Sequence, residues 1–177
     1  MHRLSLPLFS YRLWSDMPKI FLILHNIRSV HNVGSLFRTA DAIGVSSLYL
    51  TGFTPTPVDR FGRARKDLAK VSLGAQLTVP WEQRKSLRSL LRALRSAGAR
   101  IVALEQHPRA IDYKKLRVKK ESAIAVVVGN EVSGIPESIL TLCDTIAEIP
   151  MRGRKESLNV SVAAGIFLFR LFDEIGF

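Results

Sequence analysis

Residues 149–166 read IPMRGRKESLNVSVAAGI, a strand end that turns into a basic loop and then into an apolar helix. Pro150 lacks an amide hydrogen and cannot continue a strand ladder, so the preceding strand ends with backbone carbonyls free for a ligand. Ser157 or Asn159 can cap a helix that begins near Leu158, because each carries a short side-chain oxygen. The stretch therefore predicts a ligand site between a strand end and a capped helix.

The helix that follows this loop is apolar on more than one side. Its apolar residues are Val160, Val162, Ala163, Ala164, Ile166, Phe167, Phe169, Leu171 and Phe172. A surface helix usually has one apolar stripe, so we expect this helix to pack on two sides, one of which can be a partner chain. Taken alone, the stretch is equally compatible with an ordinary capped strand–loop–helix unit, and the rest of the chain has to decide.

The composition predicts one globular domain with a polyanionic partner. The chain has 177 residues, of which 47% are apolar, enough for a substantial core. Its 26 Lys and Arg against 15 Asp and Glu give a net charge of +11 and a pI near 10.4, which favours nucleic acid. A basic surface without such a role, or a membrane surface, is the weaker alternative. No apolar run approaches the ~18 residues of a membrane span, so we expect a cytoplasmic protein.

Several common kinds of chemistry are disfavoured by the sequence. Cys143 is the one cysteine, which excludes an internal disulfide and a multi-cysteine metal site. His25, His31 and His107 lie beside no cysteine or nucleophile-elbow serine, and we interpret them as structural or surface histidines. The glycine spacings of the dinucleotide and phosphate-binding loops are absent. We therefore expect neither a metal nor nucleotide hydrolysis.

Short apolar runs alternate with helical stretches along the chain. The expected strands are residues 21–25, 47–51, 100–105, 123–129 and 145–149. Residues 124–128 are continuously apolar, which is typical of a strand covered on both faces. The pattern predicts an α/β fold with a mostly parallel sheet flanked by helices.

The intervening segments predict two longer helices and one basic loop. One helix is expected over residues 33–43, ending at Gly44, and a basic amphipathic helix over 81–97. Residues 54–74 contain two prolines and two glycines, so we expect a loop with at most one short helix. Its basic residues are Arg60, Arg63, Arg65, Lys66 and Lys70. This cluster either contacts a phosphate backbone or is a solvated loop.

Two further polar segments follow expected strands, where open α/β sheets bind ligands. The first carries Asn26, Arg28 and Asn32, with Arg38 on the next helix. The second is GNEVSG, residues 129–134, with Glu131 between two glycines. Together with the first stretch, they place three polar loops at strand ends.

The three segments resemble the SpoU (TrmH-type) family of RNA ribose methyltransferases within the SPOUT superfamily, over about residues 21–172. The family's first motif, N-x-R-x-x-x-N-x-G-x-x-x-R, is matched by Asn26, Arg28, Asn32, Gly34 and Arg38. Its second, G-x-E-x-x-G, is matched by Gly129, Glu131 and Gly134, and its third by the opening stretch with Ser157, Leu158 and Asn159. The resemblance implies a deep trefoil knot formed by the C-terminal part of the chain, although true knots are otherwise nearly absent from proteins.

The resemblance also implies a cofactor and a reaction. S-adenosylmethionine is expected in the knot, held by three loops whose positions here are Leu104, Glu105, Gly129, Asn130, Glu131, Ile149, Met151, Ser157 and Leu158. The reaction implied is methylation of a ribose 2′-hydroxyl in transfer or ribosomal RNA. The implied catalytic residues are Arg38, Asn32, Glu131, Ser157 and Asn159. Because an arginine is effectively always protonated, we expect Arg38 to grip the target phosphate or stabilise the developing alkoxide, oriented by Asn32.

The family's proteins act as homodimers whose active sites draw on both chains, so a homodimer is expected here. RNA contacts are expected from Arg28, Arg60, Arg63, Arg65, Lys66 and Arg154, together with the 81–97 helix and the basic residues of 109–120. We expect residues 1–20 to form a short N-terminal extension and residues 21–177 the methyltransferase domain, without a separate RNA-binding domain. The alternatives are a non-enzymatic RNA-binding or assembly factor that retains the fold, and a methyltransferase acting on a base or a protein.

Overall fold

The computed structural model describes residues 18–118 and 123–175, which form a parallel sheet covered by helices. The strands are β1 (Ile20–His25), β2 (Ser47–Thr51), β3 (Trp81–Arg84), β4 (Arg100–Leu104), β5 (Ile111–Asp112), β6 (Ile124–Val128) and β7 (Thr145–Glu148). Their order in the sheet is β3-β2-β1-β6-β4-β7-β5, and every paired ladder is parallel. The predicted fold class is confirmed, and each of the expected strands is present to within one residue at either end.

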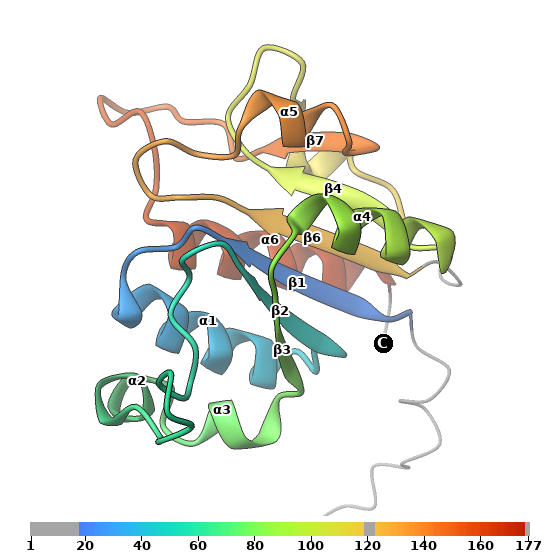
Figure 1. Cartoon of the computed structure of the whole chain (residues 1–177). Coiled ribbons are helices and arrows are strands. Elements are labelled where there is room, and N and C mark those ends of the chain that lie inside the picture. The colour runs from blue at the N-terminus through green and yellow to red at the C-terminus, as the bar shows by residue number, and fades with distance from the viewer. Residues whose placement is uncertain (1–17, 119–122, 176–177) are drawn as a thin grey trace, which may run out of the picture.

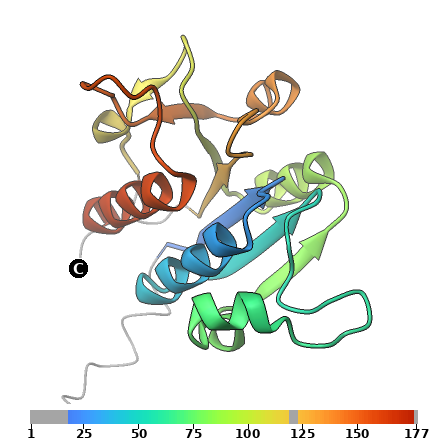
Figure 2. The same ribbon diagram turned by 90° about the vertical axis from the view of Figure 1, so that its left-hand side faces the viewer.

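Helices cover both faces of this sheet (Figures 1 and 2). They are α1 (Val30–Ala42), α2 (Lys66–Ser72), α3 (Ala75–Thr78), α4 (Leu87–Ser96), α5 (Glu137–Leu140) and α6 (Val160–Ile175), with a 3₁₀ turn at Tyr113–Lys115. Figure 2 shows α1 and α6 on one face, and α4 and α5 on the other. The helices α2 and α3 pack against the outer side of α1.

The core divides into two layers because neighbouring side chains of a strand point to opposite faces. In β1, Leu22 and Leu24 pack on the side of α1 and α6, whereas Ile23 packs on the side of α4 and α5. Every residue of β6 is buried, as its continuous apolar run predicts. β6 therefore lies at the centre of the molecule, between β1 and β4.

The helix after β1 begins three residues earlier than predicted. Ser29 caps it, since the Ser29 hydroxyl accepts a hydrogen bond from the Asn32 N–H, and the helix starts at Val30. Asn32 consequently lies in the first turn of α1. The family motif thus spans the loop after β1 and the start of this helix.

The prediction of one helix over residues 81–97 is wrong in its first part. Residues 81–84 form β3, which pairs with β2 and extends the sheet by one strand. Ser86 then caps α4, whose leucines 87, 90, 91 and 94 are buried as predicted. Four residues give too little periodicity to separate a short edge strand from the first turn of a helix.

The segment of residues 54–74 is mostly loop, as expected, and contains α2. The short stretches β5, α3 and α5 were not predicted, because each is at most four residues long. The N-terminal extension lies outside the described residues over positions 1–17. The trefoil knot is a matter of threading, which strand order alone does not establish, and it stays a prediction of the family resemblance.

Candidate active site

A cavity of about 380 Å³ lies where β4, β6 and β7 end, at the carboxyl edge of the sheet. These strands are neighbours in the sheet, so the loops that follow them converge. The cavity is lined by Leu104, Glu105, Gln106, Val128, Gly129, Asn130, Glu131, Val132, Gly134, Glu148, Ile149, Met151, Glu156, Ser157, Leu158, Asn159, Val160 and Ala163. Its volume is in the range of small-molecule sites, about 300–1,000 Å³.

Glu131 ties the loop after β6 to the start of α1. Its Oε2 accepts the backbone N–H of Arg28 at 3.0 Å, and its Oε1 accepts the backbone N–H of Ser29 at 3.1 Å. The Asn32 side-chain amide donates to the same Oε1 at 2.8 Å. One carboxylate therefore holds three donors from the first motif, about 100 positions away in sequence.

Asn32 extends this connection to the third motif. Its Oδ1 accepts a hydrogen bond from the Asn159 amide at 3.0 Å. Asn159 in turn caps α6, because its Oδ1 accepts the Ser161 N–H at 2.9 Å and the Ser161 hydroxyl at 2.7 Å. Asn159 rather than Ser157 is thus the capping residue, and α6 begins at Val160 instead of Leu158. The chain Glu131–Asn32–Asn159 joins all three motifs.

The pKa of Glu131 reflects these contacts. Partial burial acts to raise the pKa of this carboxyl, but the hydrogen bonds from Arg28, Asn32 and Ser29 outweigh it and lower the pKa below its ordinary value. The ionised form is the one that can accept from all of these donors at once. Glu131 is therefore a carboxylate at neutral pH and has no proton to donate.

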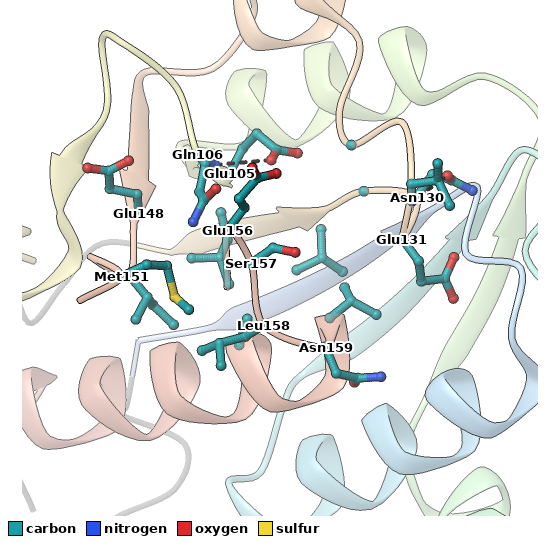
Figure 3. Close-up of a pocket in the computed structure, with 18 residues that line it drawn as sticks. Glu105, Gln106, Asn130, Glu131, Glu148, Met151, Glu156, Ser157, Leu158 and Asn159 are labelled. Atoms are coloured by element: carbon teal, nitrogen blue, oxygen red, sulfur yellow. Dashed lines mark hydrogen bonds between the residues drawn. The ribbon is translucent and has the colours of Figure 1, made fainter. Parts of the chain in front are cut away.

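Glu105 fixes the loop of the second motif from the other side. Its Oε2 accepts the Ile135 N–H at 2.8 Å, and its Oε1 accepts the Gln106 N–H at 3.0 Å (Figure 3). Gly134 has a φ of +64°, and a Cβ at this position would lie 2.5 Å from Glu105 Oε2. A Cβ at Gly129 would lie 2.6 Å from the Gly134 carbonyl carbon. Gly134 thus allows the close approach to the Glu105 carboxylate, and Gly129 allows the close approach to the backbone of Gly134.

Asn26, the first motif residue, is held in a left-handed conformation with φ 56°. Its Oδ1 accepts the Phe53 N–H at 3.3 Å, and its carbonyl accepts from the Asn130 amide at 2.8 Å. His25 lies beside it, with Nδ1 2.9 Å from Thr51 Oγ1 and Nε2 3.2 Å from the Asn26 amide nitrogen. Asn26 therefore connects β1 to the loops after β2 and β6.

All nine residues expected to bind the cofactor line the cavity, as do Glu131, Ser157 and Asn159 of the catalytic set. Figure 3 shows Glu131 and Asn159 at one end of the cavity, with Glu148 and Met151 at the other. The sequence reasoning missed Gln106, Glu148 and Glu156, which also line it. Glu148 is the last residue of β7 and directly precedes Ile149, so its position at a strand end was the available signal.

Arg38 is placed differently from the expectation. It is exposed on α1 and does not line the cavity. Its guanidinium has no hydrogen-bond or ion-pair partner in the described part of the chain. Within one chain the Asn32 side chain is bonded to Glu131 and Asn159, and the orientation of Arg38 by Asn32 stays a prediction.

The cavity is acidic although the chain is strongly basic. Its ionisable lining residues are Glu105, Glu131, Glu148 and Glu156, and no Lys, Arg or His is among the residues that line it. The net charge of the whole chain is +11. A cationic or dipolar ligand therefore suits this cavity better than an anionic one.

The residues expected to contact RNA are all at least partly exposed but differ in pairing. Arg63 is bound to Asp59 at 2.7 Å and Arg65 to Asp67 at 2.6 Å. Within the described residues, Arg60 and Lys66 have no carboxylate partner. Arg28 follows the first strand, and Arg154 lies exposed in the loop between β7 and α6. In the described residues these ion pairs are separate and do not form one network.

Other reactive groups in the described chain are not part of this site. Burial raises the pKa of the Cys143 thiol to about 11, so this thiol is not a nucleophile at neutral pH. Among residues 18–118 and 123–175, no cluster of His, Cys, Asp and Glu has the arrangement of a metal site. No helix in those ranges is long and apolar enough to cross a bilayer.

This protein has a parallel sheet, and its three motif loops meet around a cavity at the carboxyl edge of that sheet. It therefore belongs to the class of α/β proteins that bind small molecules at strand ends. The chain belongs to the SpoU rRNA Methylase family, whose model matches residues 19–169. A curated relative, the 23S rRNA (guanosine-2′-O-)-methyltransferase RlmB of Ralstonia nicotianae, is 35% identical over 152 residues, covering 86% of this chain and 57% of the relative. The chain thus spans little more than half the length of that protein.

Solved structures share the fold. The AdoMet-bound rRNA methyltransferase from Sinorhizobium meliloti superposes with a TM-score of 0.78 at 28% identity, over 87% of this chain and 56% of that one. A protein described in work on the 2-OH methylation of C/U34 on tRNA superposes with a TM-score of 0.76 at 26% identity. That match covers 89% of this chain and 97% of the other.

Proposed function

We propose that this protein transfers a methyl group from S-adenosylmethionine to a ribose 2′-hydroxyl of RNA. The observation that carries the proposal is the series of side-chain hydrogen bonds from Glu131 to Asn32 and from Asn32 to Asn159. It joins the family's three motifs around one cavity. Two relatives that match most of this chain are methyltransferases of ribosomal RNA, and one of them is bound to AdoMet, while a third match concerns methylation of tRNA. The site and its family therefore support the same activity.

The cavity fits S-adenosylmethionine by charge as well as by size. This molecule carries a sulfonium and an ammonium group, and the cavity is lined by glutamates without a cationic side chain. Leu104, Ile149, Met151 and Leu158 supply apolar walls for an adenine. When bound, the cofactor supplies a methyl group activated by its positive sulfur.

This chain's residues have separate roles in the proposed reaction. Glu131, Asn32 and Asn159 hold the loops in place, because their polar atoms are occupied by one another and by backbone groups. Arg38 is left to act on the RNA, where its planar guanidinium can grip a phosphate or stabilise negative charge on the ribose oxygen. Ser157 lines the cavity, which supports a role for it in contacting the cofactor.

We propose a homodimer in which Arg38 of the partner subunit completes the site, since Arg38 does not line the cavity of its own chain. The surface that supports this is on α6, where Val162, Ile166 and Phe169 are 50%, 39% and 48% exposed. These residues are spaced by four and three positions and form one apolar stripe. An exposed apolar stripe beside the buried face of a helix is typical of a protein interface.

Transfer RNA is the proposed substrate, ahead of ribosomal RNA. The match to the protein studied for C/U34 methylation covers nearly the whole of that chain, whereas the match to RlmB covers 57% of it. A pyrimidine in an anticodon loop is unpaired, so its ribose is accessible without opening a duplex. The cytoplasmic location expected from the sequence fits this substrate and stays a prediction.

The test is methylation by the purified full chain, with unmodified transfer RNA and a 23S rRNA fragment as substrates. We expect mass spectrometry of digested RNA to show a 2′-O-methyl nucleoside, and Arg38→Ala and Arg38→Lys each to lower kcat about 100-fold or more, because lysine lacks the bidentate fork. Arg84→Lys, on the exposed Glu82–Arg84 pair, is the control and should retain activity.

Three results would contradict the proposal. A methylated base in place of ribose would mean a different reaction. RNA binding without S-adenosylmethionine binding in calorimetry would favour a non-enzymatic RNA-binding factor. Near-normal turnover by Arg38→Lys would remove the bidentate role of this arginine.

A further inference from the structure

Phe61 is an exposed aromatic side chain at the tip of the loop between β2 and α2. It is 66% exposed, although burying a phenylalanine is favourable. The Arg60 guanidinium carbon lies 4.7 Å from the ring centroid, and that of Arg63 lies 5.0 Å from it. These distances are within the range of cation–π contacts, so the ring and the guanidinium groups form one assembly on the surface.

The tip is held in shape by Asp59. Its Oδ1 accepts the backbone N–H groups of Phe61 at 2.8 Å and Arg63 at 3.0 Å. Its Oδ2 accepts from Arg63 Nε at 2.8 Å. Val58 and Ala64 form an antiparallel bridge at the base of the tip. The ring is therefore presented to solvent by a structured turn and does not require ordering on binding.

The charge of the tip points to a polyanion. The nearby carboxylates, Asp59 of the tip and Asp67 at the start of α2, are each paired with an arginine of the loop. Arg60 and Lys66 are left without a carboxylate partner in the described residues. A second copy of this chain would bring the same positive charge to the same place, which disfavours the tip as a self-association surface.

The loop begins at the edge of the sheet that holds the candidate active site. Phe53 lies two residues after the end of β2, and its N–H donates to the side-chain oxygen of the first motif residue, Asn26. Figure 2 shows the loop between β2 and α2 on the side of α1 that is away from α6. An RNA held at the cavity can therefore extend along the loop toward Phe61.

We propose that Phe61 and Arg60 form a stacking platform for an unpaired base of the RNA substrate, with Arg60 and Lys66 binding the adjoining phosphates. The inference rests on the proposed function and adds the structural class of RNA that is recognised. Aromatic rings and guanidinium planes stack on splayed-out bases of single-stranded loops, whereas bases within a duplex are not accessible to them. The platform thus selects a loop over a paired stem.

The experiment measures binding of two synthetic RNAs to the full chain, an anticodon stem-loop and a fully paired duplex of equal length. We expect Phe61→Ala to weaken stem-loop binding about tenfold, the typical contribution of one base–aromatic stack, and to leave duplex binding unchanged. Phe61→Trp should retain the affinity for the stem-loop. Binding of this variant should quench the fluorescence of a 2-aminopurine base placed in the RNA loop. Leu77→Ala, at a side chain that is 84% exposed on α3, is the matched control.

Specific outcomes overturn the platform. If Phe61→Ala lost the same affinity for the stem-loop and for the duplex, the ring would support general phosphate binding by its neighbouring arginines and would not stack on an unpaired base. Conversion of a dimer into a monomer by Phe61→Ala in light scattering would place the ring in a protein interface. An unchanged stem-loop affinity would remove any role in binding.

The platform and the proposed function fail in different ways. If the wild-type chain binds the stem-loop through Phe61 but transfers no methyl group, the proposed function is wrong and the platform stands. If the chain methylates RNA and Phe61→Ala leaves the KM for RNA unchanged, the platform is wrong and the proposed function stands. With both correct, Phe61→Ala raises the KM for RNA while kcat and the affinity for S-adenosylmethionine stay constant.

Discussion

At the scale of single residues, Glu131 determines how the motif loops are arranged. Both of its oxygens accept hydrogen bonds, from Arg28 N–H at one and from Ser29 N–H and the Asn32 amide at the other. Glu131→Gln replaces one oxygen by an NH₂ group, which then faces donors. We expect a loss of about 1–2 kcal/mol in the free energy of unfolding, measured by urea titration, and weaker cofactor binding.

The matched control is Glu82→Gln. Glu82 pairs with Arg84 on the surface at 2.8 Å, and both side chains are about half exposed. Such a pair contributes less than about 0.5–1 kcal/mol, so this variant should unfold like the wild type. If Glu131→Gln and Glu82→Gln had the same free energy of unfolding, the hydrogen bonds of Glu131 would not contribute to the stability of the fold.

His25 makes stability depend on pH. The Asn26 amide donates to Nε2, so the network assigns the proton of the neutral ring to Nδ1, facing Thr51. Burial lowers the pKa of His25 below its ordinary value of 6.5. Between the folded and unfolded pKa values the unfolded chain binds more protons, so stability rises with pH there and is fully present above pH 6.5.

Urea titrations between pH 5 and pH 8 test this dependence. The wild-type free energy of unfolding should fall as the pH drops below 6.5, and His25→Gln should remove that part of the fall. The same slope in wild type and variant would assign the dependence to other groups.

Residue identities were easier to predict than residue roles. The residues that the family resemblance implies for cofactor binding all line one cavity, because strand ends of a parallel sheet meet at one edge. The sequence did not indicate the hydrogen bonds of Glu131, since its partners lie about 100 positions away and come close only when β1 and β6 pair. Nor did it show that Arg38 lies outside the cavity of its own chain.

At the scale of elements, α6 has two apolar sides with different surroundings. Ala164, Phe167, Leu168 and Leu171 are buried in the core, whereas the stripe of Val162, Ile166 and Phe169 is exposed. We expect Ile166→Glu to convert a dimer into a monomer, because a charge in an apolar interface is strongly unfavourable. If Arg38 acts on the partner's site, this variant should also lose most methyltransferase activity.

Light scattering at micromolar concentration measures the change in mass, and Leu77→Glu is the control at an exposed leucine outside α6. The control should remain a dimer. A monomeric wild type would refute the dimer, and a monomeric but fully active Ile166→Glu would refute the shared site.

Element prediction succeeded where burial was two-sided and failed at the edge of the sheet. β6 is buried along its whole length, so its apolar run was unambiguous. β3 carries Trp81 followed by the exposed residues Glu82, Gln83 and Arg84, and it is a strand because it pairs with β2. That pairing is tertiary, and no local pattern of four residues contains it.

At the scale of the whole molecule, opposite charges are separated in space. The chain carries +11, while the cavity is lined by glutamates. A basic exterior attracts RNA through the release of counterions, and an acidic cavity suits a sulfonium ligand. The two proposed substrates are therefore distinguished by charge before any specific contact forms.

This separation predicts different salt responses for the two ligands. RNA affinity should fall steeply as salt rises, because each phosphate contact contributes about 0.7–0.9 to the slope of log K against log salt. Arg60 of the loop and Lys66 at the start of α2 have no carboxylate partner among residues 18–118 and 123–175. The double variant Arg60→Ala with Lys66→Ala should lower that slope by about one to two. Glu82→Gln with Arg84→Gln leaves the net charge unchanged and should leave the slope unchanged. S-adenosylmethionine affinity should vary little over the same range, and a flat response for RNA would refute the electrostatic basis of its binding.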